Sequence, residues 1–372
     1  MNIDDVVLEF VKNTRHSVHN ENFSETEEVR LKALFIDCLS LIVNHHNEAL
    51  IPTFILCNTY DKYSTILPVR LKRSEYKYYL LYDIHLNKIN RLLNIIYYSD
   101  QDSGHDIWKL SYELFAENSL LEEDEVLLTY FGLNKVALGS FEITENNQVD
   151  ADFVLDIQER YFIGHELGHW IYKVSTNTDK CSIANIGLCE DSSTLLTDIK
   201  KLLSELYEAY EKVFQEQEYV ELIHEQKELV LDNDGIWEEC FADAIAYAVA
   251  FTYVQTQYPH NQNQMLLAGQ ALFLEMMNLQ LLAMQHMAVA EESFESSTSI
   301  RLGFLRNYAY LYFEDNTELF NNMLEETVIR YENRITNPML ECFAELEHRA
   351  DNIYSALADS DGQLDISMIL GL

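Results

Sequence analysis

The stretch His165-Glu166-Leu167-Gly168-His169 decides how the rest of the chain is expected to fold. Two histidines four residues apart on a helix lie one turn apart on the same face, so their imidazoles can bind one metal ion. Glu166 points toward the same cleft and need not bind the metal, which leaves its carboxylate available as a base. Apolar residues around the stretch repeat with a helical period and predict a helix over residues 150–173. The competing interpretation is a pair of histidines hydrogen-bonded in the core, with Glu166 exposed.

A second stretch, Glu239-Cys240-Phe241-Ala242-Asp243, contains a candidate for the third metal ligand. A catalytic zinc site uses three protein ligands and keeps one position open. Glu239 and Asp243 share a helix face, so Glu239 can bind the metal while Asp243 holds the other ring nitrogen of a ligand histidine. Glu238 would point about 100° away and is the weaker candidate ligand. The alternative is a solvated helix face, but the apolar neighbours of both carboxylates argue against it.

Other residues compete for the role of metal ligand. The alternative third ligands are His224, His260 and His286. Cys181 and Cys189 would be the core of a second metal site, but no cluster of histidines or cysteines adjoins them. Gly168 is a small residue at a point where another helix or a substrate can pass close.

The two motifs together resemble those of a known group of enzymes. H-E-L-G-H followed by E-x-x-A-D is similar to the gluzincin clan of metallopeptidases, and looks closest to soluble relatives of the HtpX and CAAX-endopeptidase type or to the ImmA-like peptidases. The segment Glu295–Arg301 resembles the H-P-x-x-x-x-R segment of that family. Arg301 matches its arginine, whereas Glu295 and Ser296 replace its histidine and proline.

The resemblance implies a zinc-dependent endopeptidase that acts on a peptide or protein substrate. The ligands would be His165, His169 and Glu239, with Asp243 behind them, and zinc would activate a water and polarise the scissile carbonyl. Glu166 would be the general base, and Arg301 or one of the 23 tyrosines would stabilise the oxyanion. Two alternatives stay open. One is a catalytically silent relative that binds or regulates, and the other is a helical scaffold without metal.

Composition narrows the class of protein. The formal net charge of −37 repels phosphate backbones, so nucleic acid is not an expected partner. Such charge would favour basic peptides, but a solvated acidic surface is the simpler explanation. Six scattered cysteines indicate free thiols in a reducing compartment, and residues 1–14 lack the apolar core of a signal peptide. We therefore expect a cytoplasmic protein.

The pattern along the chain predicts an α+β, mainly α-helical protein with a small sheet. The predicted strands are 51–57, 66–71, 76–86 and 135–144, with a polar turn at 145–150. The predicted helices are 3–20, 25–47, 86–98, 107–130, 150–173, 192–231, 236–254, 265–290, 300–313, 316–332 and 338–357. Polar residues within 265–290 favour a buried core helix over a membrane span. The expected organisation is an N-terminal helical region (1–50), a zincin-like core (51–310) and a C-terminal helical region (311–372).

Overall fold

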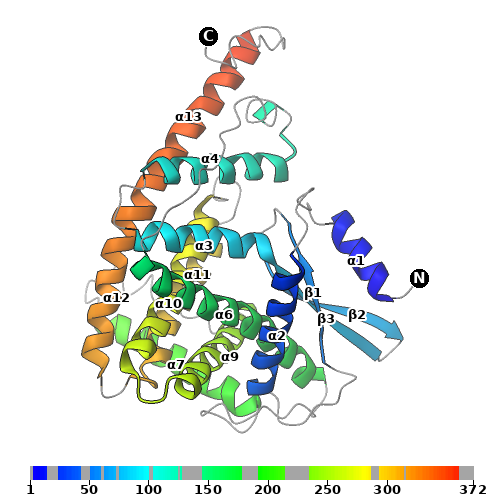
Figure 1. The fold of residues 1–372 in the computed structure, drawn as a ribbon, viewed down its shortest axis with the longest axis vertical. Helices are drawn as coiled ribbons and strands as arrows, with labels where there is room; N and C mark the ends of the chain where they lie inside the picture. The colour runs from blue at the N-terminus through cyan, green and yellow to red at the C-terminus, as the bar shows by residue number, and fades with distance from the viewer. Residues whose placement is uncertain are drawn as a thin grey trace.

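The protein is mostly helical, with one three-stranded sheet at its side (Figure 1). This α+β, mainly helical architecture confirms the predicted fold class. The computed structural model describes residues 3–14, 24–42, 51–59, 63–72, 75–99, 104–124, 126–127, 145–177, 192–213, 234–285, 293–313 and 316–359. The predicted strand at 135–144 lies outside these residues, as do the ends of several predicted helices.

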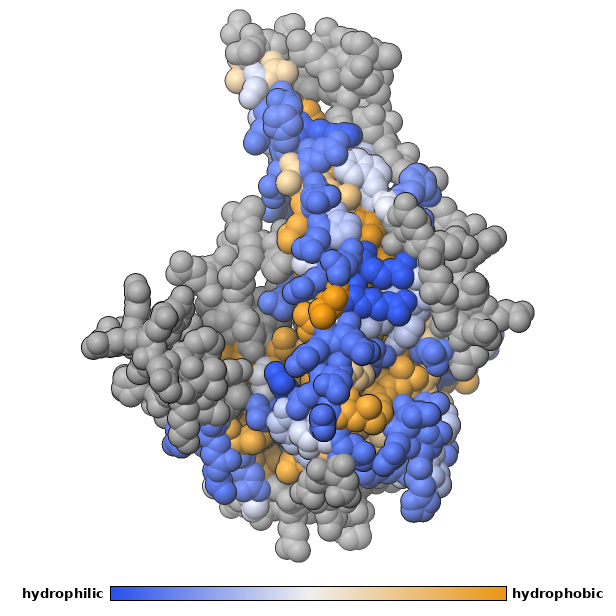
Figure 2. All heavy atoms as spheres, turned by 90° about the vertical axis from the view of Figure 1, so that its left-hand side faces the viewer, coloured by the Kyte–Doolittle hydropathy of each residue, from blue (hydrophilic) through white to orange (hydrophobic). Residues whose placement is uncertain are grey.

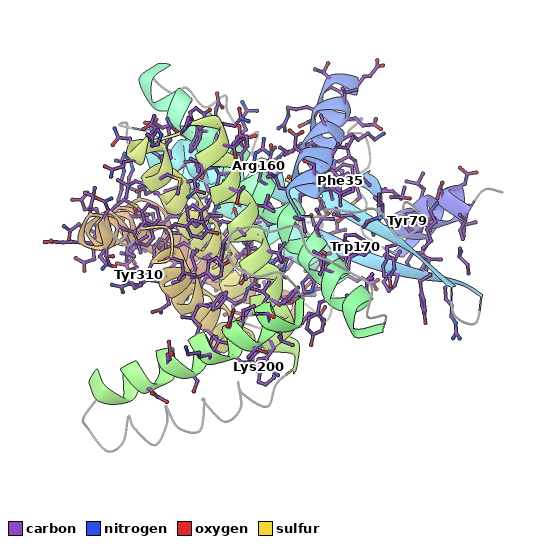
Figure 3. All side chains as sticks on the ribbon, turned by 90° about the horizontal axis from the view of Figure 1, so that it is seen from below. Phe35, Tyr79, Arg160, Trp170, Lys200 and Tyr310 are labelled. Atoms are coloured by element: carbon purple, nitrogen blue, oxygen red, sulfur yellow. The ribbon has the colours of Figure 1, made fainter. Side chains whose placement is uncertain are left out.

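The sheet contains β1 (Thr53–Cys57), β2 (Thr65–Lys72) and β3 (Glu75–Asp83). β3 is the central strand, parallel to β1 and antiparallel to β2. Alternate residues of β3 face opposite sides, so Tyr79 and Leu81 pack against α1 (Ile3–Thr14) and Tyr78, Leu80 and Tyr82 join the main core. In Figure 3, Tyr79 lies between the sheet and α1.

The predicted strand over 76–86 is too long. β3 ends at Asp83, whose carboxylate accepts a hydrogen bond from the His85 N–H at 2.9 Å and caps α3 (Ile84–Tyr98). An aspartate in this position satisfies an N–H that the helix leaves without a partner. The helix therefore begins directly after the strand, while the apolar run continues into it.

Two long helices occupy the centre of the molecule. α6 (Glu145–Asn177) and α9 (Asp234–Gln257) lie side by side and share more contacts than any other pair of elements. The predicted turn at 145–150 is wrong, because α6 already begins at Glu145. These residues are polar but include no glycine or proline, and acidic residues are favourable in a first helical turn.

The backbones of α6 and α9 approach closely because glycine and alanine meet at the crossing. A Cβ on Gly168 would lie 2.5 Å from the Cα of Ala242, and one on Gly164 would lie 2.9 Å from the Cα of Ala246. No real Cβ fits at such distances, so both positions require glycine for this packing. The small residue expected at Gly168 therefore admits a helix. This contact places the histidines of α6 opposite the carboxylates of α9.

Other helices surround this pair. α2 (Glu25–Ile42) is tied to α6 by Arg30, which donates to both oxygens of Glu159 at 2.5 and 2.6 Å. α7 (Ser192–Val213) and α11 (Ser293–Ala309) pack on α9. α4 (Gly104–Leu121) is shorter than the predicted helix 107–130, and the backbone turns at Glu123, where φ is 57°.

α10 (Gln262–Gln285) contacts α6, α9, α11 and α12. In the described part of the chain, it is the one helix long and apolar enough to cross a membrane, and 61% of its most apolar stretch is buried inside the protein. Its central residues Ala268, Ala271 and Leu272 are fully buried. A helix covered on most sides in this way contributes to the core.

The last two predicted helices form one continuous rod. α12 (Thr317–Tyr331) passes through a π-helical turn (Glu332–Thr336) into α13 (Asn337–Asp359) without a break (Figure 1). Pro338 cannot donate an N–H and would clash with a carbonyl of the preceding α-turn. The wider turn, in which the Asn337 N–H bonds to the Glu332 carbonyl, accommodates it. The face of the rod in Figure 2 is mostly hydrophilic. A few apolar side chains of α12, such as Ile329, are also exposed.

Candidate metal centre

The two motif histidines face one another on α6. The Nε2 atoms of His165 and His169 are 3.1 Å apart, and the two rings are nearly perpendicular, with an angle of 86° between their planes. Both side chains are almost buried, with exposed fractions of 11% and 12%. Spacing four residues apart therefore does bring both rings to one point, as the sequence predicts.

Glu239 supplies a carboxylate from α9 at the same point. Its Oε2 lies 3.4 Å from the Nε2 of His165, and its Oε1 lies 3.4 Å from the Nε2 of His169. Within the residues described, these three form the one group of histidine, cysteine and acidic side chains whose ligand atoms all lie within 4.8 Å of one another. The Glu239 carboxylate keeps 36% of its surface exposed, so the group is open to solvent on that side.

The spacing of these atoms fits a small metal ion. Tetrahedral coordination with bonds of about 2.0–2.1 Å separates neighbouring ligand atoms by about 3.3 Å. The 3.1 Å between the two Nε2 atoms is close to that value. Each Nε2 also lies 3.4 Å from one oxygen of Glu239, Oε2 for His165 and Oε1 for His169. Two imidazoles and one carboxylate are also a donor set that divalent transition metals accept. The group could therefore hold a metal ion.

Asp243 lies behind the first histidine, one turn along α9 from Glu239. The Nδ1–H of His165 donates to Asp243 Oδ1 at 2.9 Å, because an ionised carboxylate can only accept. The Tyr161 hydroxyl donates to the same oxygen at 2.6 Å. Asp243 is completely buried, and its bond to Nδ1 leaves the Nε2 lone pair of His165 directed at the site.

Arg301 reaches this cluster from α11. Its Nε donates to Asp243 Oδ2 at 2.8 Å and its NH2 to Asp243 Oδ1 at 2.7 Å, while its NH1 lies 3.1 Å from Glu239 Oε2. The same NH2 also donates to the Tyr161 hydroxyl at 2.9 Å. The structure thus joins Arg301 to the candidate site, and its donors are directed at Asp243, Glu239 and Tyr161. Glu295, at the start of the segment that ends in Arg301, lies in the first turn of α11.

Glu238 has a role that the sequence does not reveal. Its Oε1 accepts a hydrogen bond from the Nδ1–H of His169 at 2.8 Å and lies 3.5 Å from the Nζ of Lys173. As predicted, it is not in the group that meets at the candidate metal position. Its contact with His169 depends on the crossing geometry of α6 and α9, for which the sequence carries no direct signal. The bond between Tyr161 and Asp243 likewise depends on how α6 packs against α9.

Glu166 is the remaining acidic residue of the motif. Its side chain is buried, and its Oε2 has no hydrogen-bond partner in the described structure. Burial raises the pKa of this carboxyl, partly offset by the neighbouring His165 and His169. The unpaired oxygen is free to accept a hydrogen bond from a water or substrate group.

The charges of the cluster are strongly coupled. Burial opposes ionisation of Asp243, but the Arg301 guanidinium and His165 outweigh it and lower its pKa to about 2. Burial likewise opposes protonation of His169, but its bonds to Glu238 and Glu239 raise its pKa to about 10. The carboxylates around His169 therefore favour its protonated form. Metal binding requires neutral histidines, so it would compete with protonation of this ring.

Of the alternative ligands considered from the sequence, the structure describes only His260, and His260 takes no part in the candidate site. His260 lies in the turn after α9, with φ at 65°, and is exposed. His224, His286, Cys181 and Cys189 lie outside the described residues.

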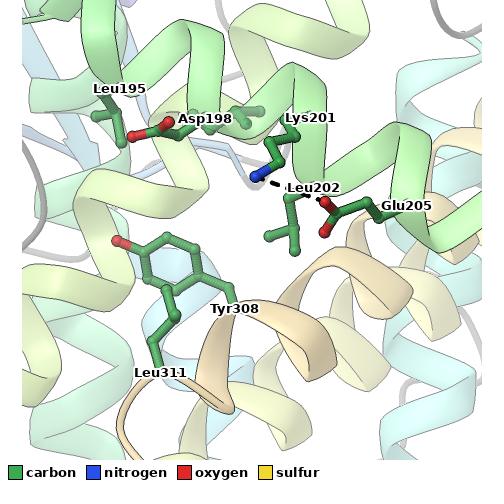
Figure 4. Close-up of a pocket in the computed structure, with 8 residues that line it drawn as sticks. Leu195, Asp198, Lys201, Leu202, Glu205, Tyr308 and Leu311 are labelled. Carbon is green, nitrogen blue, oxygen red and sulfur yellow. Dashed lines mark ion pairs between the residues drawn. The ribbon is translucent and has the colours of Figure 1, made fainter.

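A cavity of about 230 Å³ lies between α7 and α11 (Figure 4). Its apolar lining comes from Leu195, Ile199, Leu202 and Leu311, with Tyr308 on one wall. Lys201 and Glu205 form an ion pair of 3.7 Å at its edge. The same helix α7 is fastened to α9 by Lys200, labelled in Figure 3, whose Nζ lies 3.3 Å from the centroid of the Trp237 ring.

The sequence matches no protein-family model, no curated protein and no solved structure.

Proposed function

We propose that the protein is a zinc-dependent endopeptidase, with His165, His169 and Glu239 as the metal ligands. The observation that supports the proposal is the meeting of these three side chains, with ligand atoms within 4.8 Å of one another, beside a buried Glu166 carboxylate with an unpaired oxygen. In this proposal the sheet, α6 and α9 form a zincin-like core, and the remaining helices are additions to it. Three protein ligands leave one coordination position for water or substrate, as in catalytic zinc sites.

A zinc ion bound here would supply Lewis-acid polarisation of the scissile carbonyl and would lower the pKa of water at the site. Glu166 takes the proton of the attacking water and then delivers it to the departing amine. A raised carboxyl pKa suits this double role, because the group must both accept and release a proton near neutral pH. Asp243 and Arg301 hold the ligands in place, since both are bonded within the cluster.

A second candidate is a metal-binding protein that does not hydrolyse peptides. The donors of Arg301 are directed at Asp243, Glu239 and Tyr161, and Glu295 replaces the histidine of the related motif. In this second candidate, no side chain of the cluster stabilises the oxyanion that peptide hydrolysis generates. The protein would then use its metal centre to bind or regulate a partner.

One experiment separates these functions. A peptide library with and without a chelator is incubated with the wild type and with Glu166→Gln, alongside a control, Glu345→Gln, whose glutamate is exposed on α13. We expect the chelator to abolish cleavage, and Glu166→Gln to lower kcat by about 100- to 10,000-fold with its metal retained. The control should cleave normally. Activity that survives both the chelator and Glu166→Gln would rule out zinc hydrolysis, and bound metal without any cleavage would favour the second candidate.

A further inference from the structure

Each ligand histidine is paired with its own carboxylate from α9, and each carboxylate is paired with its own cation. His165 bonds to Asp243, which bonds to Arg301. His169 bonds to Glu238, which lies beside Lys173, one turn further along α6. The resemblance to known peptidases points only to the first chain of contacts, and the second chain is a feature of this structure.

The two pairs differ in their surroundings. The Asp243 carboxylate is completely buried, whereas 25% of the Glu238 carboxylate surface is exposed. The Lys173 side chain is 36% exposed. The His169 side therefore forms the outer edge of the metal centre, where water competes for every contact. Glu238 is the acceptor at Nδ1 of the His169 ring, so removing its carboxylate would give the ring more freedom to rotate.

Two neighbouring glutamates of α9 contact opposite sides of the His169 ring. Glu238 and Glu239 are successive residues, so their side chains leave the helix about 100° apart. Glu239 Oε1 lies 3.4 Å from the Nε2 of His169, whereas Glu238 Oε1 lies 2.8 Å from its Nδ1. One glutamate thus faces the metal side of the ring and the other faces its far side.

We propose that Glu238 is a positioning residue that fixes His169 as a metal ligand. The carboxylate places the ring proton on Nδ1, which leaves the Nε2 lone pair directed at the candidate metal position and prevents rotation of the ring. The inference rests on the proposed metal centre and extends it to a residue outside both sequence motifs. Removing such a partner typically lowers metal affinity about 10- to 100-fold.

The test measures zinc affinity by competition with a chromophoric chelator. Glu238→Ala should bind zinc about 10- to 100-fold more weakly than the wild type. Glu238→Gln keeps an oxygen that can accept the Nδ1–H bond, so its loss should be smaller. Glu345→Ala, which removes an exposed carboxylate far along the chain on α13, should bind like the wild type.

Nitrogen NMR of the zinc-loaded protein provides a second readout, independent of activity. The Nδ1 proton of His169 should give a protected, strongly hydrogen-bonded signal in the wild type and in Glu238→Gln, and should lose that protection in Glu238→Ala. If Glu238→Ala does not fold, the variant Glu238→Met, which is closer in size to glutamate and also has no oxygen acceptor, replaces it in both measurements with the same expected losses.

The outcomes keep the two proposals apart. A wild type that binds no zinc refutes the metal centre itself. If the wild type binds zinc, then Glu238 variants with unchanged affinity and an unchanged Nδ1 signal refute the role of Glu238 alone.

Discussion

Two buried polar clusters lie on α10 and its neighbours, and the pKa values of their carboxyl groups shift in opposite directions. In the metal centre, Asp243 is surrounded by Arg301, His165 and Tyr161. In the second cluster, Glu275 of α10 accepts a hydrogen bond from the Asn90 amide at 2.8 Å. That cluster continues through Asn278 to the Tyr331 hydroxyl.

The difference appears in the ionisation of the two carboxyls. Arg301 and His165 overcome the cost of burial and lower the pKa of Asp243 to about 2. Burial raises the pKa of Glu275 to about 8, because the Asn90 amide only partly offsets it. A buried carboxylate thus stays ionised only where a cation lies beside it. The candidate metal centre thus keeps the Asp243 carboxylate ionised in the interior, as the proposed cation site requires.

The largest expected effect comes from removing the guanidinium of Arg301, the positive charge beside Asp243. Arg301→Met should lower the free energy of unfolding by about 3–5 kcal/mol, because Asp243 is left charged, buried and short of donors. Urea unfolding of the metal-free protein measures this. Arg306→Met is the matched control, since Arg306 lies on the same helix and is exposed. Equal effects of the two substitutions would contradict the assigned importance of the Arg301 contacts.

In the second cluster, the ionisation of Glu275 should lower the stability of the protein as pH rises, whereas the ionisation of Asp243 stabilises it. The pKa of Glu275 is about 8 in the folded protein against an ordinary 4.5, so the folded state holds a proton that the unfolded chain releases in this window. Stability should therefore fall as pH rises from 4.5 to 8, by about 1.4 kcal/mol per pH unit.

Urea unfolding across this window, with Glu275→Gln beside the wild type, isolates that slope. The glutamine cannot ionise, so the difference in stability between the two proteins should shift in favour of Glu275→Gln as pH rises. Asp243 acts in the other direction, since its stabilising charge is lost only as pH falls from 3.8 toward about 2. Parallel curves for the wild type and Glu275→Gln would refute the protonated state of Glu275.

A smaller effect is expected where the two central helices cross. Gly168→Ala places a Cβ 2.5 Å from the Cα of Ala242 and should destabilise the protein by about 1–3 kcal/mol, despite a helix-propensity gain of about 1 kcal/mol. Gly164→Ala, with 2.9 Å to the Cα of Ala246, should cost less. Thermal unfolding ranks the two. Stabilisation by both changes would show that the helices do not approach this closely.

The smallest effect is expected at the hydroxyl that contacts both Asp243 and Arg301. Tyr161→Phe removes hydrogen bonds of 2.6 and 2.9 Å but keeps the ring, so it should cost about 0.5–1.5 kcal/mol. Zinc affinity should fall less than in Glu238→Ala, because Asp243 retains its bond to His165. If Tyr161→Phe lowers the free energy of unfolding more than Arg301→Met does, the order of importance within the cluster is the reverse of the one expected.

The sequence predicts what depends on spacing within one helix. His165 with His169, and Glu239 with Asp243, are each four residues apart, so their shared faces follow from helix geometry alone. Gly168 indicated a close approach by another helix or by a substrate, but the sequence did not show which.

What depends on contacts between elements could not be predicted. The bond from His169 to Glu238 arises from the angle at which α6 and α9 cross, and polarity alone gave a false turn at 145–150. The continuous rod depends on a π-helical turn before Pro338, where the sequence indicates a helix end. The end of β3 is set by the cap at Asp83, which an apolar run through residue 86 conceals.

Elemental analysis of the purified protein, beside His165→Ala, tests the central claim most directly. The three converging side chains predict about one zinc ion per chain in the wild type after incubation with zinc and removal of excess metal. His165→Ala should remain folded by circular dichroism and retain almost none. A wild type without stoichiometric metal, or a His165→Ala protein that binds as much as the wild type, would contradict the metal centre.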